Sequence, residues 1–376
     1  MEIVIILIPF FLSILLGRYI IPYIIYITYK KRLFDPIDSR KVHQSITPRL
    51  GGVAFVPIQC VIFGITSILV YKIPLISSMV LFDRESWAIM PMFILFMCGL
   101  FILYILGVAD DLVGVSYKFK FFIQFLVASF LPISGLWIND LYGVGFLVEI
   151  SPWVGVPFTI FVVILIINAI NLIDGLDGLC SGLAAVACLV LGCLFAYYDS
   201  WSYSLLAFIT LGILISFFYY NVFGTTKRRR RIFMGDTGSM TLGYTLAFLA
   251  ISFSMRNHSI KPFSEGAIVV AASTLIVPVF DVARVMVVRF LTKSPLFKAD
   301  RNHLHHKLLR AGMSHKQAMM SIIGLSLFFC ALNIALVQYI SNNLLLILNF
   351  VIWLVLTAIF NFIVNNRDLR KSNQVS

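Results

Sequence analysis

The chain has 376 residues, of which 60% are hydrophobic and only 12% charged, and its formal net charge is +12. Soluble globular domains carry about 25% charged residues, so this composition excludes an ordinary soluble protein. Apolar stretches of about 20 residues, long enough for a helix to cross a bilayer, recur along the whole chain.

Eleven hydrophobic windows predict an all-α polytopic integral membrane protein with about eleven transmembrane helices. The first window has no small-residue cleavage pattern after it, so it is expected to be a retained span. The ninth contains Pro278, which should kink or break its helix because proline lacks an amide N–H. No loop is long enough to fold alone, so residues 1–376 are expected to form a single domain. The windows lie at residues 3–28, 51–71, 88–108, 121–138, 153–170, 179–198, 203–222, 239–255, 265–291, 318–340 and 343–365.

Lysine and arginine are concentrated on one side of this topology. One set of loops, together with the C-terminal tail and with Arg284 and Arg289 at the end of the ninth window, holds 24 of the 29 Lys and Arg residues, and Arg18 lies inside the first window. Basic loops face the cytoplasm, which predicts a cytoplasmic C-terminus, an outside N-terminus and an active site facing the cytoplasm. The loops are residues 29–50, 109–120, 171–178, 223–238 and 292–317.

The densest charge run is KRRRR, from Lys227 to Arg231. Such a run is typical of an anchor on anionic headgroups. Attraction of an anionic substrate is a compatible second effect. No nucleic-acid recognition fold accompanies the run, so no nucleic-acid partner is expected.

Acidic residues are scarce, and several lie at the ends of windows on the predicted cytoplasmic face. Asp110 and Asp111 end the third window, and Lys118, Lys120 and Gln124 follow shortly after. The acidic pair could simply be the polar cap of a helix that meets water. Adjacent carboxylates also repel each other and can recruit a divalent cation, and Mg²⁺ takes such oxygen ligands together with substrate phosphates.

The stretch NAINLIDGLDGL carries Asn168, Asn171, Asp174 and Asp177 at three-residue intervals. Residues three apart are neighbours on a helix face, so the last three side chains could point into one cleft. The alternative is a helix cap with Asx turns.

The stretch FMGDTGS, residues 233–239, joins a basic loop to an apolar helix that starts near Ser239. Backbone N–H groups at a helix start favour anions, and Asp236 lies there. Phe233 offers an aromatic face on which a ring could stack, although an interfacial anchor is an equally good interpretation.

Two basic segments add anion-binding capacity on the same face. Three histidines lie among basic residues in 299–312, a setting that suits a pyrophosphate better than zinc. A solvated basic loop is the alternative. The second segment is 38–52, which precedes the second window. The candidates are Arg301, His303, His305 and His306 in the first segment and Lys41 and His43 in the second.

Taken together, these motifs resemble the polyprenyl-phosphate N-acetylhexosamine-1-phosphate transferases, glycosyltransferase family 4. The form of the histidine motif and the R-K-x-H segment are similar to the branch that uses UDP-N-acetylglucosamine and undecaprenyl phosphate. The phospho-N-acetylmuramoyl-pentapeptide branch is the alternative. The motifs are RKVH-x4-PR-x-GG (40–52), DD-x6-K-x-K-x3-Q (110–124), N-x2-N-x2-DG-x-DGL (168–179), FMGDTGS (233–239) and HLHH (303–306).

The resemblance implies transfer of N-acetylglucosamine-1-phosphate, or of a related sugar phosphate, from the UDP-sugar to undecaprenyl phosphate, with release of UMP. This would be the first membrane step of a cell-surface polysaccharide such as O-antigen, common antigen, teichoic acid or capsule. It implies a bacterial cytoplasmic membrane enzyme that uses Mg²⁺, for which Mn²⁺ could substitute, and it allows a homodimer. A remote alternative is an ion-coupled transporter, whose aspartates would lie near the bilayer midplane rather than at one face.

The resemblance also implies residue roles. Asp236 would be the main Mg²⁺ ligand with Asp110, and Asp110 and Asp111 would act on the lipid phosphate. Direct attack by that phosphate is favoured over a covalent aspartyl intermediate. The family's proline-containing link before FMGD is replaced here by a longer basic segment, which leaves Asn221 a weak candidate for the nucleotide site. The nucleoside side would be lined by Asn171, Asp174, Asp177 and Phe233; pyrophosphate and sugar would be held by Lys41, Arg301, His303, His305 and His306; the further substrate-binding candidates are His43, Lys118, Lys120 and Asn168.

Overall fold

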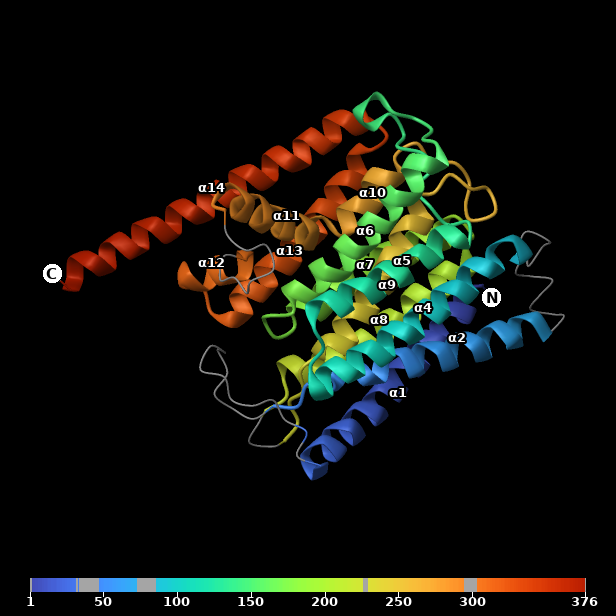
Figure 1. Ribbon diagram of the computed structural model, residues 1–376, viewed down its shortest axis with the longest axis horizontal. Helices are drawn as coiled ribbons and strands as arrows, with labels where there is room; N and C mark the ends of the chain where they lie inside the picture. Colours follow the sequence, from blue (N-terminus) through green and yellow to red (C-terminus); the bar gives the residue numbers. More distant parts are fainter. Residues whose placement is uncertain are drawn as a thin grey trace.

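Every one of the eleven apolar windows overlaps a helix or a pair of helices for most of its length. The computed structural model describes residues 2–31, 33, 47–72, 86–225, 229–293 and 303–375 (Figure 1). The helices that follow the predicted windows are α1 (Glu2–Lys31), α2 (Phe55–Lys72, preceded by the 3-10 turn η1, Gly51–Ala54), α4 (Ser86–Val113), α5 (Tyr117–Ile133), α6 (Pro152–Ile173), α7 (Leu179–Tyr197), α8 (Trp201–Val222), α9 (Gly235–Ser254), α10 (Ala267–Thr274), α11 (Ile276–Leu291), α13 (His315–Leu336) and α14 (Asn342–Val375). A short helix that no window predicted, α12 (Leu304–Arg310), carries the histidine motif.

The centre of the bundle is α9, whose residues from Thr237 to Ser254 are all buried. It packs against α4, α6, α7 and α10. Small residues let neighbouring helices approach closely, because packing rather than the hydrophobic effect holds helices together in lipid. At Gly243 of α9, a Cβ atom would come within 2.8 Å of the Ile167 Cα of α6. The middle of α9 is therefore packed directly against the backbone of α6.

The predicted break in the ninth window is confirmed. Helices α10 and α11 meet at Leu275 with a bend of 76°. Pro278 lies in the first turn of α11, and its missing N–H would otherwise have bonded to the Thr274 carbonyl at the end of α10. The bend turns α11 across the bundle toward α12 (Figure 1).

The all-helical, multi-pass prediction is confirmed for the part of the chain that the structure describes. There, eight helices are long and apolar enough to cross a membrane, and the bent α10–α11 pair would be a ninth. Helices α5 and α9 are not among them. α5 has only 17 residues, and α9 begins with the polar run GDTGS. In the same residues, extended pairing is limited to an isolated bridge between Asp140 and Glu149.

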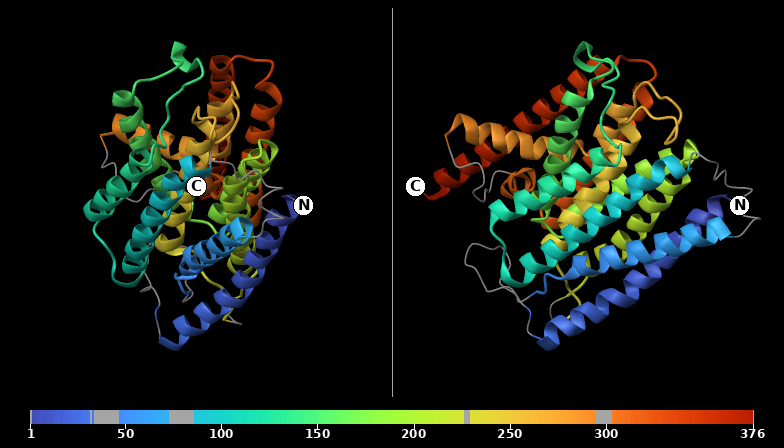
Figure 2. Two further views of the ribbon diagram at one scale, coloured as in Figure 1. Left: turned by 90° about the vertical axis from the view of Figure 1, so that its right-hand side faces the viewer. Right: turned by 45° about the vertical axis from the view of Figure 1, so that its right-hand side comes forward.

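The predicted motifs meet at one end of the bundle, around the start of α9. The Gly51 and Gly52 amides donate to the carbonyls of Phe233 (3.0 Å) and Met234 (2.8 Å), and the Phe233 amide donates to Pro48 (2.7 Å). A side chain on Gly52 would overlap the backbone of α9. The connections 134–151 and 255–266 lie at the other end of the bundle, as two views show (Figures 1 and 2).

Candidate active site

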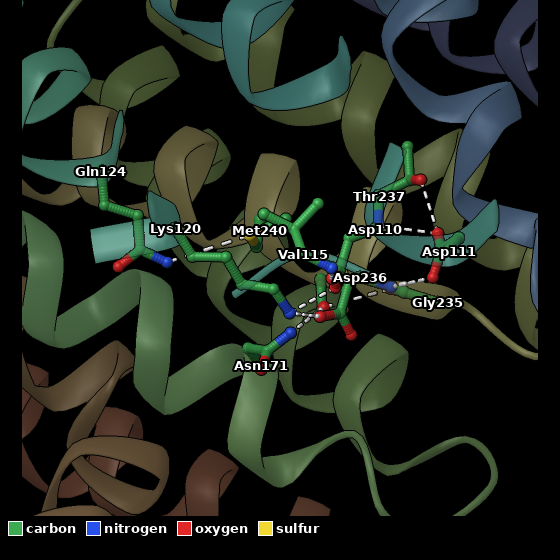
Figure 3. A network of polar contacts seen from close by, with 11 residues as sticks. Asp110, Asp111, Val115, Lys120, Gln124, Asn171, Gly235, Asp236, Thr237 and Met240 are labelled. Carbon is green, nitrogen blue, oxygen red and sulfur yellow. Dashed lines mark hydrogen bonds and ion pairs between the residues drawn. The ribbon is translucent and has the colours of Figure 1, made fainter. Parts of the chain in front are cut away.

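A lysine bridges two aspartates from different helices at the start of α9 (Figure 3). Lys120 of α5 donates to Asp236 of α9 with an Nζ–Oδ2 distance of 2.7 Å and forms an ion pair with Asp110 of α4. The other Asp110 oxygen accepts from the Val115 amide at 2.7 Å, which fixes the α4–α5 connection. The Asp236 side chain is 33% exposed, so a ligand can reach this cluster.

Asp111 points the other way and caps α9. Its Oδ1 accepts from the Asp236 amide at 2.8 Å, and its Oδ2 accepts from the Thr237 amide at 3.0 Å and the Thr237 hydroxyl at 2.6 Å. A carboxylate at a helix start satisfies amides that have no partner within the helix and interacts favourably with the helix dipole. Both Asp111 oxygens are therefore engaged in holding Asp236 in place.

Asn168 and Asn171 of α6 contact α5 and α9 beside the Asp110–Lys120–Asp236 cluster. Asn168 donates to the Gln124 carbonyl oxygen at 2.7 Å, and Asn171 donates to the Ser239 hydroxyl at 2.8 Å. The Asn171 side chain also lies against the Asp236 carboxylate (Figure 3). Helices α5, α6 and α9 are thus joined by polar contacts, as expected where polar groups lie between apolar helices.

The prediction that the three-residue spacing marks one helix face is wrong beyond Ile173. Helix α6 ends there, Asp174 is its C-cap, and residues 174–178 form a turn that closes at Gly178 with φ of +76°. Burial raises the pKa of the Asp174 carboxyl well above its usual range, and the nearby negative charges of Asp236, Asp177 and Asp111 raise it further.

Arg231 ties this turn to the segment before α9. Its guanidinium pairs with Asp177 and lies 5.5 Å from the centre of the Phe233 ring. One face of the predicted stacking ring is therefore covered by a cation, and a nucleobase would use the other face or displace Arg231. Sequence reasoning did not foresee this pair, although both residues stood in motifs that it had marked.

Asn221 connects the turn at 174–178 to the segment before α9. It is buried, accepts from the Gly178 amide at 2.6 Å and donates to the Ile232 carbonyl at 2.8 Å. Its amide group is thus bonded to backbone on both sides, which makes it a support for the site rather than a ligand-facing group.

The histidine motif is anchored by a carboxylate that sequence reasoning missed. Asp281 of α11 accepts from His303 Nδ1 at 2.9 Å, from the Leu304 amide at 3.0 Å and from Arg284 at 2.8 Å. Asp281 is buried. A charged residue inside an apolar helix is a functional candidate by default, so its position in the ninth window was the available signal.

His305 faces the turn that follows α6. A Cβ atom on Gly175 would lie 2.9 Å from its Nε2, and its ring packs against those of His303 and His306. Burial lowers the pKa of His305 to about 3, helped by the two neighbouring histidines, so the ring is neutral at pH 7. Neither ring nitrogen has a hydrogen-bond partner among the described residues. A buried, unpaired imidazole is costly unless a ligand bonds to it.

The remaining sequence candidates differ in their positions. Lys118 is exposed in the first turn of α5. His306 stacks on His305 at a ring distance of 4.2 Å. Lys41, His43 and Arg301 lie outside the described residues.

The donor set at Asp110 and Asp236 fits a divalent cation. The two carboxylates already share one cation, the Lys120 ammonium. In the described residues, no three His, Cys, Asp or Glu side chains are grouped so as to hold a metal. Mg²⁺ commonly takes one or two carboxylates and leaves its other positions to substrate phosphates and water, so two carboxylates suffice.

Comparison with known proteins gives a consistent set of relatives. Residues 92–254, from α4 to the end of α9, match the family described as glycosyl transferase family 4. The chain is 30% identical over 96% of its length, and 89% of the relative's, to a probable undecaprenyl-phosphate N-acetylglucosaminyl 1-phosphate transferase of Bacillus subtilis. It is 29% identical to the undecaprenyl-phosphate alpha-N-acetylglucosaminyl 1-phosphate transferase of Yersinia pestis, over 77% of this chain and 73% of that one. The corresponding Escherichia coli K12 protein is 28% identical over 78% of this chain and 73% of its own length.

Proposed function

The chain belongs to glycosyl transferase family 4, and from that premise we propose that it transfers N-acetylglucosamine-1-phosphate from UDP-N-acetylglucosamine to undecaprenyl phosphate and releases UMP. The observation that carries the proposal is the full-length similarity to an enzyme named for this acceptor and this sugar. The matched region contains the Asp110–Lys120–Asp236 cluster, where a charged phosphate could be received.

The proposed reaction is a displacement at the phosphorus that carries the sugar. An oxygen of undecaprenyl phosphate forms a bond to the β-phosphorus of UDP-N-acetylglucosamine, and the bond from that phosphorus to the bridging oxygen breaks. The electron pair leaves on UMP, so no external oxidant or reductant is required. We favour this single displacement because phosphoryl transfer depends mainly on positioning and charge neutralisation.

In this scheme Asp110 and Asp236 would hold Mg²⁺, which when bound would supply charge neutralisation at the pyrophosphate. The Lys120 ammonium, which now lies between these carboxylates, would turn toward a phosphate oxygen. Charge-assisted hydrogen bonds of this kind are roughly twice as strong as neutral ones. Asp111 is a positioning residue here, since its oxygens hold the amides of Asp236 and Thr237.

The nucleotide would lie on the side of Asp177, Arg231 and Phe233. Arg231 offers a cation beside an aromatic ring, a combination that suits a base and its phosphates. The pyrophosphate and sugar would lie toward the histidines. A neutral His305 can donate one ring N–H and accept at the other nitrogen, which suits a sugar hydroxyl better than a second negative charge.

The membrane arrangement is part of the same proposal. The distribution of basic residues supports a cytoplasmic site and C-terminus and an outside N-terminus. The bacterial relatives support a location in the bacterial inner membrane. Eleven crossings require that α5 and α9 also span the bilayer. Nearly complete burial of α9 supports this, because lipid does not reach its serines and threonines. Assembly as a homodimer stays a prediction.

Two alternatives are not favoured. The relatives are named for N-acetylglucosamine rather than for a muramoyl-pentapeptide. An ion-coupled transporter would place its charged groups near the bilayer midplane, whereas Asp110 and Asp236 lie at helix ends.

The test is release of UMP by the purified full-length protein from a panel of UDP-sugars. We expect release from UDP-N-acetylglucosamine only when undecaprenyl phosphate and Mg²⁺ are both present, and loss of release in Asp236→Asn. Release without the acceptor lipid, or from UDP-N-acetylmuramoyl-pentapeptide alone, would contradict the proposal. Near-complete activity of Asp236→Asn would contradict the metal assignment.

A further inference from the structure

Two adjoining cavities lie between α1, the C-terminal end of α8 and residues 229–230. Their volumes are about 410 and 260 Å³, and they share Pro22, Ile25 and Arg229 in their linings. This combined space, here called the α1–α8 cavity, has no lining residue in common with the Asp110–Lys120–Asp236 cluster. Small-molecule sites typically measure about 300–1,000 Å³, so the space is large enough for a lipid headgroup.

The cavity begins next to the close contact between α1 and α8 at Gly17 and Ser216. A Cβ atom on Gly17 would lie 2.8 Å from the Ser216 Cβ, so the two backbones are in close contact there. Beyond Gly17, Pro22 and Ile25 of α1 line the cavity together with Tyr219 and Tyr220 of α8. The C-terminal end of α1 stands away from the other helices in Figures 1 and 2.

The lining is strongly cationic. Four basic side chains line the two cavities, and the residues named in their linings include no carboxylate. Three of the cations lie over tyrosine rings, with 5.7 Å from Arg18 to the Tyr219 ring centre, 5.7 Å for Lys30 over Tyr26 and 5.4 Å for Arg229 over Tyr29. The fourth is Arg230. Tyrosine faces attract cations, so the rings hold these three basic side chains in place while each side chain keeps its positive charge.

Four basic side chains gathered around one cavity, with no carboxylate among its named lining residues, favour an anionic ligand. Arg18 lies in the middle of an apolar helix, where an ionised side chain is costly. The four basic side chains are exposed, so the cavity is open to the surroundings of the protein and a lipid headgroup can reach it. Cations from α1 and from the segment before α9, which are far apart in the sequence, line this same space. The outer face of α1 beside it presents exposed apolar and aromatic side chains, among them Tyr23 and Ile27.

We propose that the α1–α8 cavity binds the phosphate headgroup of an anionic membrane glycerophospholipid such as phosphatidylglycerol. Arg18, Arg229 and Arg230 would donate to the phosphate oxygens, and the acyl chains would lie along the outer face of α1. The combination of clustered cations with apolar walls selects an amphipathic phosphate over a free one. This site is separate from the acceptor-lipid site and does not depend on the proposed reaction.

The experiment measures phosphatidylglycerol binding to the full-length protein by native mass spectrometry after removal of bound lipid. Arg18→Gln and the double variant Arg229→Gln with Arg230→Gln remove cavity cations. Lys31→Gln is the matched control, because Lys31 is exposed at the end of α1 and does not line the cavity. We expect affinity to fall by about tenfold or more in the cavity variants, as for the loss of one charge-assisted hydrogen bond, and to be unchanged in the control.

Competition separates the sources of phosphate. We expect phosphatidylglycerol to stay bound in excess inorganic phosphate and to bind better than phosphatidylcholine. Unchanged affinity in the cavity variants would overturn the proposal, as would an equal loss in Lys31→Gln, which would indicate diffuse surface charge. Preferential binding of undecaprenyl phosphate at these residues would reassign the cavity to the acceptor and also overturn it. If Arg18→Gln fails to fold in a thermal unfolding assay, the double variant in the exposed segment decides the question.

Discussion

Replacing Asp111 by asparagine separates a role in holding the site from a role in the chemistry. Asp111 accepts three hydrogen bonds from Asp236 and Thr237 at the start of α9. Asparagine keeps one acceptor oxygen but turns an amide N–H₂ toward groups that themselves donate. We therefore expect Asp111→Asn to loosen the start of α9 and to lower stability.

The magnitude follows from the bonds lost. Losing one hydrogen bond to a charged acceptor costs about 1.5–3 kcal/mol. Losing a negative charge at a helix start costs about 0.3–1 kcal/mol more. The expected loss of about 2–4 kcal/mol corresponds to a fall in Tm of roughly 4–8 °C, taking about 2 °C per kcal/mol for a large chain.

The assay is thermal unfolding in detergent together with UMP release at a temperature where the variant is folded. Thr237→Val is the matched control, because it removes only the hydroxyl donor, and it should cost about 1 kcal/mol. We expect Asp111→Asn to be unstable and its folded fraction to keep measurable activity that is reduced, because Asp236 is less well positioned. A variant as stable as the wild type but inactive would refute this reasoning and return Asp111 to a direct chemical role.

Four further outcomes are expected. Chelation with EDTA should stop UMP release and added Mg²⁺ should restore it; activity that survives chelation would contradict a metal-dependent reaction. Lys120→Gln should lower kcat by at least ~100-fold, because a charge that would contact the phosphate is lost. It should also lower the Mg²⁺ concentration for half-maximal activity, because the ammonium no longer occupies the space between Asp110 and Asp236. An unchanged Mg²⁺ requirement would show that the two cations do not compete. Arg231→Lys should raise KM for the UDP-sugar about tenfold with little change in kcat, since lysine cannot reproduce the planar contact with the Phe233 ring; a pure kcat effect would place Arg231 elsewhere. Burial lowers the pKa of Lys261 to about 8, so below that pH the folded state carries a desolvated charge that lowers the free energy of unfolding. This cost shrinks as the pH rises toward the unfolded pKa of about 10.4. Lys261→Met should therefore raise Tm more at pH 7 than at pH 10, and an equal gain at both would count against this cause.

The sequence predicted the helices well because hydrophobic length is a local property. It also predicted the meeting of Asp110, Lys120 and Asp236, since the distribution of basic residues placed these motifs on one face. Once these three side chains lie close together, the positive charge of Lys120 attracts the two carboxylates. The break near Pro278 followed from the missing N–H of one residue.

Other features depend on contacts that no local pattern contains. The role of Asp111 is set by amides 125 and 126 residues away along the chain. Asp281 reaches His303 only because α10 and α11 bend at Leu275. The end of α6 was the one local feature misread. Gly175 and Gly178 are helix-stop signals, and they outweighed the regular spacing of the four polar residues.

The most direct test follows the phosphorus atom. UDP-N-acetylglucosamine labelled in its β-phosphate is incubated with the purified protein, Mg²⁺ and undecaprenyl phosphate, and the lipid product and the released nucleotide are analysed by mass spectrometry. The account predicts that the label moves to the lipid, as undecaprenyl-pyrophosphoryl-N-acetylglucosamine, and that the nucleotide released is unlabelled UMP. Release of labelled UDP, with a lipid that gained the sugar but no phosphate, would contradict it.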